Sequence, residues 1–116
     1  MKIVKFIIFL VVISFVFISN SYAYDLSSIE SLRRNNSCVS CDLTNANLQG
    51  YDLTGANLSY ANLKYAKLQN ATLYKANLTG AKLKGANLKG ALWIDGSAIC
   101  KHGSIGMCVK VIEPKK

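Results

Sequence analysis

The sequence predicts an all-β fold in which the chain turns once every five residues. Leucine recurs at every fifth position from Leu43 to Leu88. At this spacing leucines would scatter around an α-helix, which advances about 100° per residue, and would alternate between the two faces of a flat strand. A coil that turns within every five-residue block instead returns each leucine to the interior. The segments on either side of the blocks lack this pattern, and we expect them to form the two ends of the coil.

Residues 1–23 have the pattern of a signal peptide. Two lysines precede an apolar run from Phe6 to Ile18. This run is shorter than the ~20 residues that a membrane span needs, and Ser21 with Ala23 supplies the small residues expected before a cleavage site. We therefore expect cleavage after Ala23 and an exported protein, periplasmic or secreted. Retention of the segment as a membrane anchor is the alternative.

Residues 24–40 are expected to cap the start of the coil with a short helix. Apolar residues recur three apart in this segment, at Leu26, Ile29 and Leu32. Ser27 and Glu30 have the spacing of a capping box. A coil exposes unpaired backbone groups at its ends, and a covering helix is one way to protect them. A linker without regular structure is the alternative.

Residues 41–95 divide into eleven five-residue blocks with the consensus Ala, Asn or Asp, Leu, a polar residue and commonly Gly. Alanine is small enough to fit beside leucine at an inner corner. The fifth residue is Gly or Asn in seven of the blocks, and both tolerate the positive φ of a tight turn. We predict a core ladder with these members: Leu43, Leu48, Leu53, Leu58, Leu63, Leu68, Leu73, Leu78, Leu83, Leu88 and Trp93.

Three residues near the ends of the repeats depart from the consensus. Cys41 and Tyr51 occupy the alanine position, so the first coil is expected to be irregular or widened. Trp93 occupies the leucine position of the last block and is expected to close the stack. Terminal repeats commonly differ from internal ones because they lack a neighbour on one side.

Blocks such as ANLQG, ANLTG and ANLKG resemble those of the pentapeptide-repeat family, whose pattern is A-(D/N)-L-x-x. This resemblance implies a right-handed quadrilateral β-helix in which four pentapeptides complete one square coil. Eleven blocks would then make about three coils, followed by a tail at residues 96–116. Residues twenty apart would lie directly above one another, which places Lys75 under Asp95 as an exposed ion pair.

Two pairs of cysteines flank the repeats. Cys38 and Cys41 precede them in a C-x-x-C pattern, and Cys100 and Cys108 follow them. One alternative is a single zinc site with His102 as a further ligand. That site would require all four cysteines to meet, whereas the stacked coils would hold the two pairs about 10–15 Å apart. A C-x-x-C of the oxidoreductase type normally opens a helix, whereas this one leads into the coil.

We instead expect a disulfide at each end of the coil. The loop between Cys100 and Cys108 is rich in turn residues, and the stretch DGSAICKHGSIGMC resembles the cysteine-framed ending of exported bacterial pentapeptide-repeat proteins. Cys38 and Cys41 are expected to pair as well, with two reduced thiols packed beneath the first coil as the alternative.

A basic face is the candidate binding surface. Lys64 and Lys84 are expected to stack on one face, with Lys82 beside them and Lys89 around the next corner. Without the signal peptide the net charge is about +6, because only two of the 14 basic residues and none of the six acids precede the cleavage site. Such a face could attract lipid headgroups, polysaccharide or nucleic acid. A solvated face that only aids solubility is the alternative. Three tyrosines are expected to point outward and could add contacts: Tyr60, Tyr65 and Tyr74.

The sequence favours a non-catalytic structural or interaction module over an enzyme. It contains no Ser/His/Asp set, paired carboxylates or phosphate-binding loop, and a solid core of three coils would leave no internal cavity. We expect no cofactor, no bound metal and no small-molecule substrate. The expected partner is an unidentified protein or an anionic component of the cell envelope.

Some members of the family regulate DNA topoisomerases by mimicking DNA, which the resemblance makes a remote alternative. Mimicry requires an acidic surface, whereas this chain is basic, and export would separate it from the chromosome. Nucleic acid is therefore disfavoured as a partner, and membrane contact is expected only through the signal peptide. Because both ends of the coil are expected to be capped, we predict a monomer.

Overall fold

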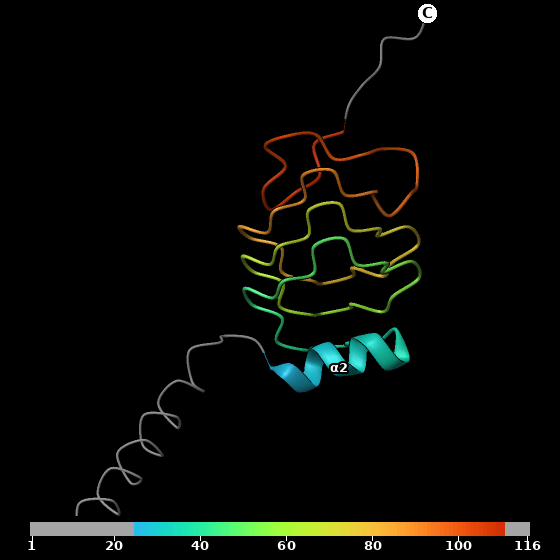
Figure 1. Ribbon diagram of the computed structural model, residues 1–116, viewed down its shortest axis with the longest axis vertical. Coiled ribbons are helices and arrows are strands. Elements are labelled where there is room, and N and C mark those ends of the chain that lie inside the picture. The colour runs from blue at the N-terminus through green and yellow to red at the C-terminus, as the bar shows by residue number, and fades with distance from the viewer. Residues whose placement is uncertain (1–24, 111–116) are drawn as a thin grey trace, which may run out of the picture.

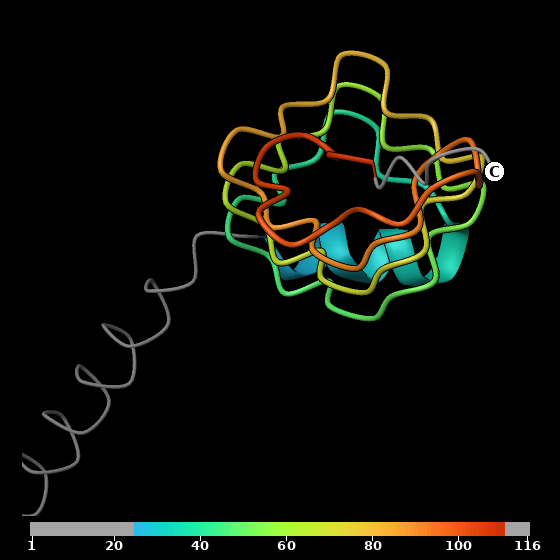
Figure 2. The ribbon, with the colours of Figure 1, turned by 90° about the horizontal axis from the view of Figure 1, so that it is seen from above.

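The computed structural model describes residues 25–110. The predicted signal peptide and the last six residues of the sequence lie outside this range. Above one short helix, α2 (Leu26–Asn35), the described chain winds through stacked coils, and its C-terminal part lies over the far end (Figure 1). Figure 2 looks along the stack and shows the coils superimposed around a common interior. No helix within residues 25–110 has the length and apolar character needed to cross a membrane.

Parallel backbone bridges join residues twenty apart, among them Asn57 with Asn77 and Asn62 with Lys82. Each of these residues is the second of its block, and the leucine that follows continues the ladder: the Leu63 N–H donates to the Lys82 carbonyl at 2.8 Å. Four blocks therefore complete one coil, which is the register of a quadrilateral β-helix. The contacts are single bridges rather than long strands because a turn follows every leucine and ends the extended stretch.

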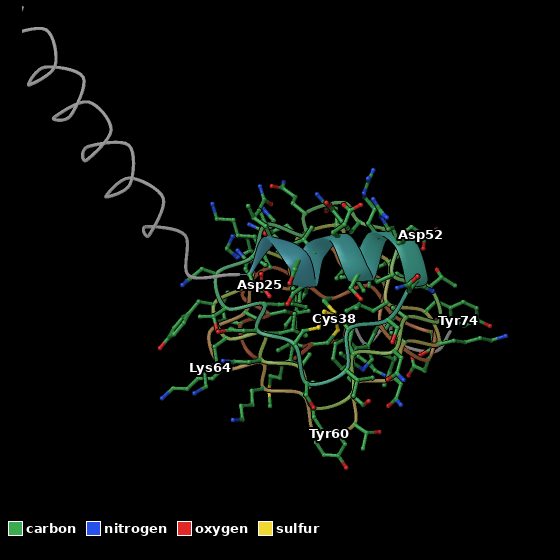
Figure 3. The ribbon with its side chains drawn as sticks, turned by 90° about the horizontal axis from the view of Figure 1, so that it is seen from below. Asp25, Cys38, Asp52, Tyr60, Lys64 and Tyr74 are labelled. Atoms are coloured by element: carbon green, nitrogen blue, oxygen red, sulfur yellow. A yellow bond between two sulfur atoms is a disulfide. The ribbon has the colours of Figure 1, made fainter. Side chains whose placement is uncertain are left out.

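The coil has four sides, and each side takes one block from every coil. Side A contains residues 36–40, 56–60 and 76–80; side B contains 41–45, 61–65 and 81–85; side C contains 46–50, 66–70 and 86–90; side D contains 51–55, 71–75 and 91–95. A bridge from Ser37 to Asn57 brings residues 36–40 into the coil ahead of Cys41. Seen from the helix end in Figure 3, Asp52, Tyr60 and Lys64 follow one another clockwise as the chain runs away from the viewer, which is the sense of a right-handed coil.

A tight turn closes every block. The leucine carbonyl accepts a hydrogen bond from the N–H three residues later, as between Leu43 and Ala46 at 3.0 Å. The fifth residue has positive φ in every block except the last, residues 91–95, as the third position of a type II turn requires. The positions are Ser40, Asn45, Gly50, Gly55, Tyr60, Tyr65, Asn70, Lys75, Gly80, Gly85 and Gly90. The left-handed conformation therefore extends beyond the Gly and Asn positions that the sequence singled out, to two tyrosines, a lysine and a serine.

The interior is a column of leucine side chains with alanines at its corners. Eight of the ten leucines in the ladder are at most 1% exposed, whereas Leu78 and Leu83 are half-buried. Trp93 is also half-buried and packs against the same core. Its backbone N–H donates to the Ala98 carbonyl at 3.0 Å. Tyr51 likewise packs partly against the core from its alanine position.

The start of helix α2 differs from the capping box expected from Ser27 and Glu30. Its N-cap is Asp25, whose carboxylate accepts the Ser27 N–H at 2.9 Å. The carboxylate of Glu30 bonds instead to two arginines three and four residues later. A capping box needs its serine at the N-cap, and the helix begins one residue before Ser27, so the geometry of the box does not arise.

Helix α2 lies across the start of the coil and covers the core there (Figure 1). Leu32 is 2% exposed and Ile29 packs partly against the same cluster. Leu26 is 71% exposed, so only two of the three apolar residues that suggested this helix pack against the core. Asn36 ends the helix in a left-handed conformation, and its N–H donates to the Leu32 carbonyl at 3.0 Å.

Residues 96–110 fold back over the far end of the coil. Antiparallel bridges join Leu92 to Ile99 and Asn87 to Ile105, which covers sides C and D of the last coil. Sides A and B are not covered in this way. Four amides there have no backbone acceptor within residues 25–110: those of Leu78, Gly80, Leu83 and Gly85. The last leucines of these two sides are half-buried, although Gly106 lies close to the backbone of Leu83 and Gly85 on side B.

Candidate functional site

The backbone hydrogen bonds between coils place three of the four predicted lysines on side B. The Leu63 N–H bonds to the Lys82 carbonyl at 2.8 Å and the Tyr65 N–H bonds to the Lys84 carbonyl at 3.0 Å, so the block of Lys64 lies directly beneath that of Lys84. Lys64 is half-buried and projects away from the coil (Figure 3), whereas Lys82 and Lys84 are exposed. Lys89 lies around the corner on side C and is exposed.

The charge of the coil is distributed unequally among its sides. Sides B and C together carry five lysines, since Lys67 joins the four predicted ones, and their one acid is Asp42 in the first coil. Side A carries no charge, and side D carries Lys75 between two aspartates. The sequence predicted a basic face, and the structure shows that two adjacent sides carry the excess of positive charge in the coil.

Asp42 is engaged by its own turn and lies two coils away from Lys82. The hydroxyl of Thr44 donates to its carboxylate at 2.6 Å and the Thr44 N–H does so at 3.0 Å. These two bonds, of which the one from the hydroxyl has the larger effect, hold the pKa of Asp42 below its usual value. The carboxylate therefore stays ionised and bonded within its block. Among residues 25–110 no acid forms an ion pair with a lysine of side B or C.

Two tyrosines stand at the corners that border side B. Tyr60 is at the corner with side A and is 62% exposed, and Tyr65 is at the corner with side C and is 54% exposed. Each ring covers the glycine of the next coil: a Cβ on Gly80 would lie 2.5 Å from Tyr60 Cδ1, and a Cβ on Gly85 would lie 2.3 Å from Tyr65 Cδ1. Sequence reasoning expected these tyrosines to point outward but missed that they frame the lysines. The twenty-residue spacing of each Tyr–Gly pair was the available signal.

The third tyrosine lies apart from this surface. Tyr74 is on side D, 37% exposed, on the other side of the coil from Lys64 (Figure 3). The Lys75 ammonium lies 5.1 Å from the centroid of its ring. The expected pair of Lys75 with Asp95 is therefore wrong, because Lys75 extends over the neighbouring ring and Asp95 bonds to Lys110 instead. The fold-back of residues 96–110 brings that second lysine to Asp95.

The cysteines are joined within each end of the coil. Cys38 is bonded to Cys41 with their Cα atoms 5.3 Å apart, and Cys100 to Cys108 with theirs 5.0 Å apart. Cys38 and Cys100 are each 1% exposed. His102 is exposed in the loop between the second pair. Nowhere in the described range do three or more His, Cys, Asp or Glu side chains gather in a way that could hold a metal ion.

A groove of about 300 Å³ lies between the end of helix α2 and the first block of side D. Its walls include Arg33, Arg34, Tyr51 and Asp52. Both guanidinium groups already bond to Glu30, and the Asp52 carboxylate accepts the N–H of Thr54. The groove therefore joins the helix to the coil and offers a ligand few uncommitted polar groups. Side B, with its uncommitted ammonium groups, is the stronger candidate site.

Comparison with known families matches residues 37–92 to pentapeptide repeats, with eight copies in two overlapping spans, 37–73 and 57–92. Among solved structures, the chain is similar to HetL, a pentapeptide repeat protein involved in heterocyst differentiation regulation from the cyanobacterium Nostoc sp. strain PCC 7120. The identity is 39% over 53% of this chain and 35% of that chain, with a TM-score of 0.38. The chain thus spans about a third of the length of HetL.

Two further pentapeptide repeat proteins of known structure are similar. One, from Nostoc PCC 7120, is 32% identical over 67% of this chain and 77% of that chain, with a TM-score of 0.28. The other, from Cyanothece 51142, is 22% identical over 56% of this chain and 82% of that chain, with a TM-score of 0.24. No curated protein matches the sequence.

Proposed function

Since the chain belongs to the pentapeptide-repeat family, we propose that it is an exported, non-catalytic interaction module that binds anionic material of the cell envelope through side B. The observation that carries this proposal is the set of three ammonium groups on one side of the coil, Lys64, Lys82 and Lys84, with no acid paired to them among the described residues. Lys67 and Lys89 continue the positive surface around the corner.

The rigidity of the coil supports a binding role for this side. Backbone hydrogen bonds tie the block of Lys64 to the blocks below and above it, as in the bond from the Asn62 N–H to the Cys41 carbonyl at 2.9 Å. The leucines behind the surface are packed into the core. Because the backbone does not have to be ordered on binding, little of the interaction free energy is lost to conformational entropy.

The charge supports an anionic partner of extended shape. A lysine close to an anionic surface contributes about 1 kcal/mol, so four lysines could strengthen binding by up to roughly a thousandfold. Stacked like charges are mildly unfavourable in the free protein, since neighbouring blocks hold Lys64 and Lys84 about 4.8 Å apart along the axis. A bound anion would relieve that repulsion.

Two observations support export. Residues 1–23 carry the pattern of a signal peptide. The two cysteine pairs are placed for disulfides, which persist in oxidising compartments outside the cytoplasm. An exported basic protein meets the anionic polymers and lipids of the envelope first, so these are the partners to examine.

The proposal is tested by retention on heparin and on vesicles that contain anionic lipid. We expect a variant with four lysines changed to glutamine to elute at clearly lower salt than the unaltered protein: Lys64, Lys82, Lys84 and Lys89. A matched control removes the same charge elsewhere: Arg33, Arg34, Lys75 and Lys101 to glutamine. If the lysine variant and its control elute together, side B is not the binding surface and the proposal fails. Purification of the full chain from envelope and medium fractions, with its N-terminus determined by mass, tests export.

A further inference from the structure

Beyond the charge of side B, the placement of its tyrosines points to one class of partner. We propose that side B, framed by Tyr60 and Tyr65, is a binding site for an acidic polysaccharide, in which sugar rings stack on the tyrosines and their anionic groups pair with the lysines. This inference rests on the proposed function, because it names the partner of the same surface.

The two tyrosines share an unusual backbone conformation. Tyr60 and Tyr65 have φ of 59° and 60°, in the left-handed region that bulky residues rarely adopt. Seven of the other fifth positions carry Gly or Asn, which adopt it with less strain. Tyrosine is thus the locally less favourable choice at two corners, and both border the same side. Ser40, at the same corner as Tyr60, and Lys75 on side D share this conformation, so three of the four such residues border side B. Strained conformations are often found at binding sites.

The rings of the two tyrosines lie against the backbone of the next coil. Each ring turns one edge toward a glycine of the next coil, with both Cδ1 and Cε1 within 2.6 Å of where a Cβ on Gly80 or Gly85 would lie. The glycines hold the rings close to the backbone, and more than half of each residue remains exposed. The aromatic surfaces are therefore fixed in place and accessible, with Lys64, Lys82 and Lys84 on the side between them.

This combination suits a polymer of sugars that carry carboxylate, sulfate or phosphate groups. The C–H faces of a sugar ring pack on an aromatic ring, which offers a large apolar surface with a polar edge. Anionic groups along the polymer accept charge-assisted hydrogen bonds from ammonium groups. A long polymer can contact both corners and the lysines between them at once, so several weak contacts act together.

A membrane surface fits less well. Strong adsorption to a bilayer combines the attraction of basic residues to anionic lipids with apolar side chains that enter the headgroup region. The exposed aliphatic residues of the far end, Ile99, Ile105 and Met107, belong to the fold-back segment of residues 96–110. Within the blocks of side B, Tyr65 is the one exposed large hydrophobic residue, and no aliphatic residue is exposed there. A single-stranded nucleic acid could also stack on tyrosines, and the test below includes it.

The test removes the rings without removing charge. A Tyr60→Gly/Tyr65→Gly variant should fold, because glycine is the preferred residue at this turn position, and Tyr60→Asn/Tyr65→Asn repeats the test with the residue found at the equivalent positions Asn45 and Asn70. Binding is measured by calorimetry to alginate, a polyuronate, and to polyglutamate, which has carboxylates but no sugar rings. We expect the Kd for alginate to rise about tenfold, the size expected for two lost stacking contacts, and the Kd for polyglutamate to stay within about twofold. Tyr74→Thr on side D is the matched control and should change neither the Kd for alginate nor the Kd for polyglutamate.

Three outcomes would overturn the inference. Loss of both tyrosines could leave the Kd for alginate unchanged, or could raise the Kd values for alginate and polyglutamate equally. Oligothymidylate could bind more tightly than alginate with the same dependence on the tyrosines, which would make the partner a nucleic acid. In the first two cases, if the four-lysine variant no longer binds alginate or polyglutamate, the proposed function stands while the polysaccharide inference fails. If that variant binds both polymers like the unaltered protein, the proposed function itself fails.

Discussion

The contact between Tyr65 and Gly85 makes a quantitative prediction about stability. A Cβ on Gly85 would lie 2.3 Å from Tyr65 Cδ1 and 2.5 Å from Cε1, well inside van der Waals contact. Gly85 also has a φ of 74°. Gly85→Ala therefore has two costs: about 1–2 kcal/mol for alanine in a left-handed conformation, and about 1 kcal/mol more because the ring must leave its place. We expect a total loss of about 2–3 kcal/mol in the free energy of unfolding.

Gly50 provides a control for the backbone part of this cost. It has a φ of 70°, but nothing lies within 4 Å of a Cβ built on it, so Gly50→Ala should cost only about 1–2 kcal/mol. The difference between the two variants corresponds to a shift in Tm of roughly 4–8 °C, which thermal unfolding followed by circular dichroism resolves. In a Tyr65→Gly background, Gly85→Ala should cost no more than Gly50→Ala. If Gly85→Ala costs the same with and without Tyr65, the ring does not lie over the glycine and the reasoning is refuted.

Three further predictions concern the core, a surface ion pair and a disulfide. Leu68→Asp places a charge in the middle coil at a site that is 0% exposed, so the coil should unfold, and a native dichroism spectrum with unchanged melting would contradict the fold. The Lys110 ammonium, followed by hydrogen bonds from Ser97, lowers the pKa of Asp95 to about 2, below its unfolded value of about 3.9. The ionised carboxylate therefore stabilises the fold above about pH 4, and this contribution disappears as the pH falls toward 2. Asp95→Asn should flatten that part of the Tm profile, and an unchanged profile would exclude these interactions. Replacing Cys100 and Cys108 by alanine should lower the free energy of unfolding by about 2–3 kcal/mol in denaturant titrations, whereas equal midpoints would show that the bond is not formed.

The coil was accessible from the sequence because its signal is periodic. The five-residue spacing of leucine predicted a turn in every block, and the resemblance to pentapeptide repeats implied four blocks per coil. Stacking residues twenty apart then assigns Lys64, Lys82 and Lys84 to one side. The same rule could have placed Tyr60 over Gly80, since it needs only the spacing. The sequence did not predict that two tyrosines adopt positive φ, because the composition of the fifth position suggested only Gly and Asn there.

The ends of the coil were harder to predict because no repeat constrains them. The N-cap of helix α2 is Asp25 rather than Ser27, and a one-residue shift of this kind lies within the ambiguity of short polar runs. The fold-back of residues 96–110 depends on contacts such as the Cys100–Lys110 bridge, which no local pattern announces. That fold-back also redirected Asp95 from Lys75 to Lys110.

The most direct test of the binding surface is an NMR titration of the isotope-labelled protein with short alginate oligomers. We predict that the amide shifts move for residues 61–65 and 81–85 and for the corner at Tyr60, while sides A and D away from that corner stay unchanged. Shifts confined to the fold-back segment or to side D, or no shifts at saturating alginate, would contradict the assignment of side B as the site of interaction.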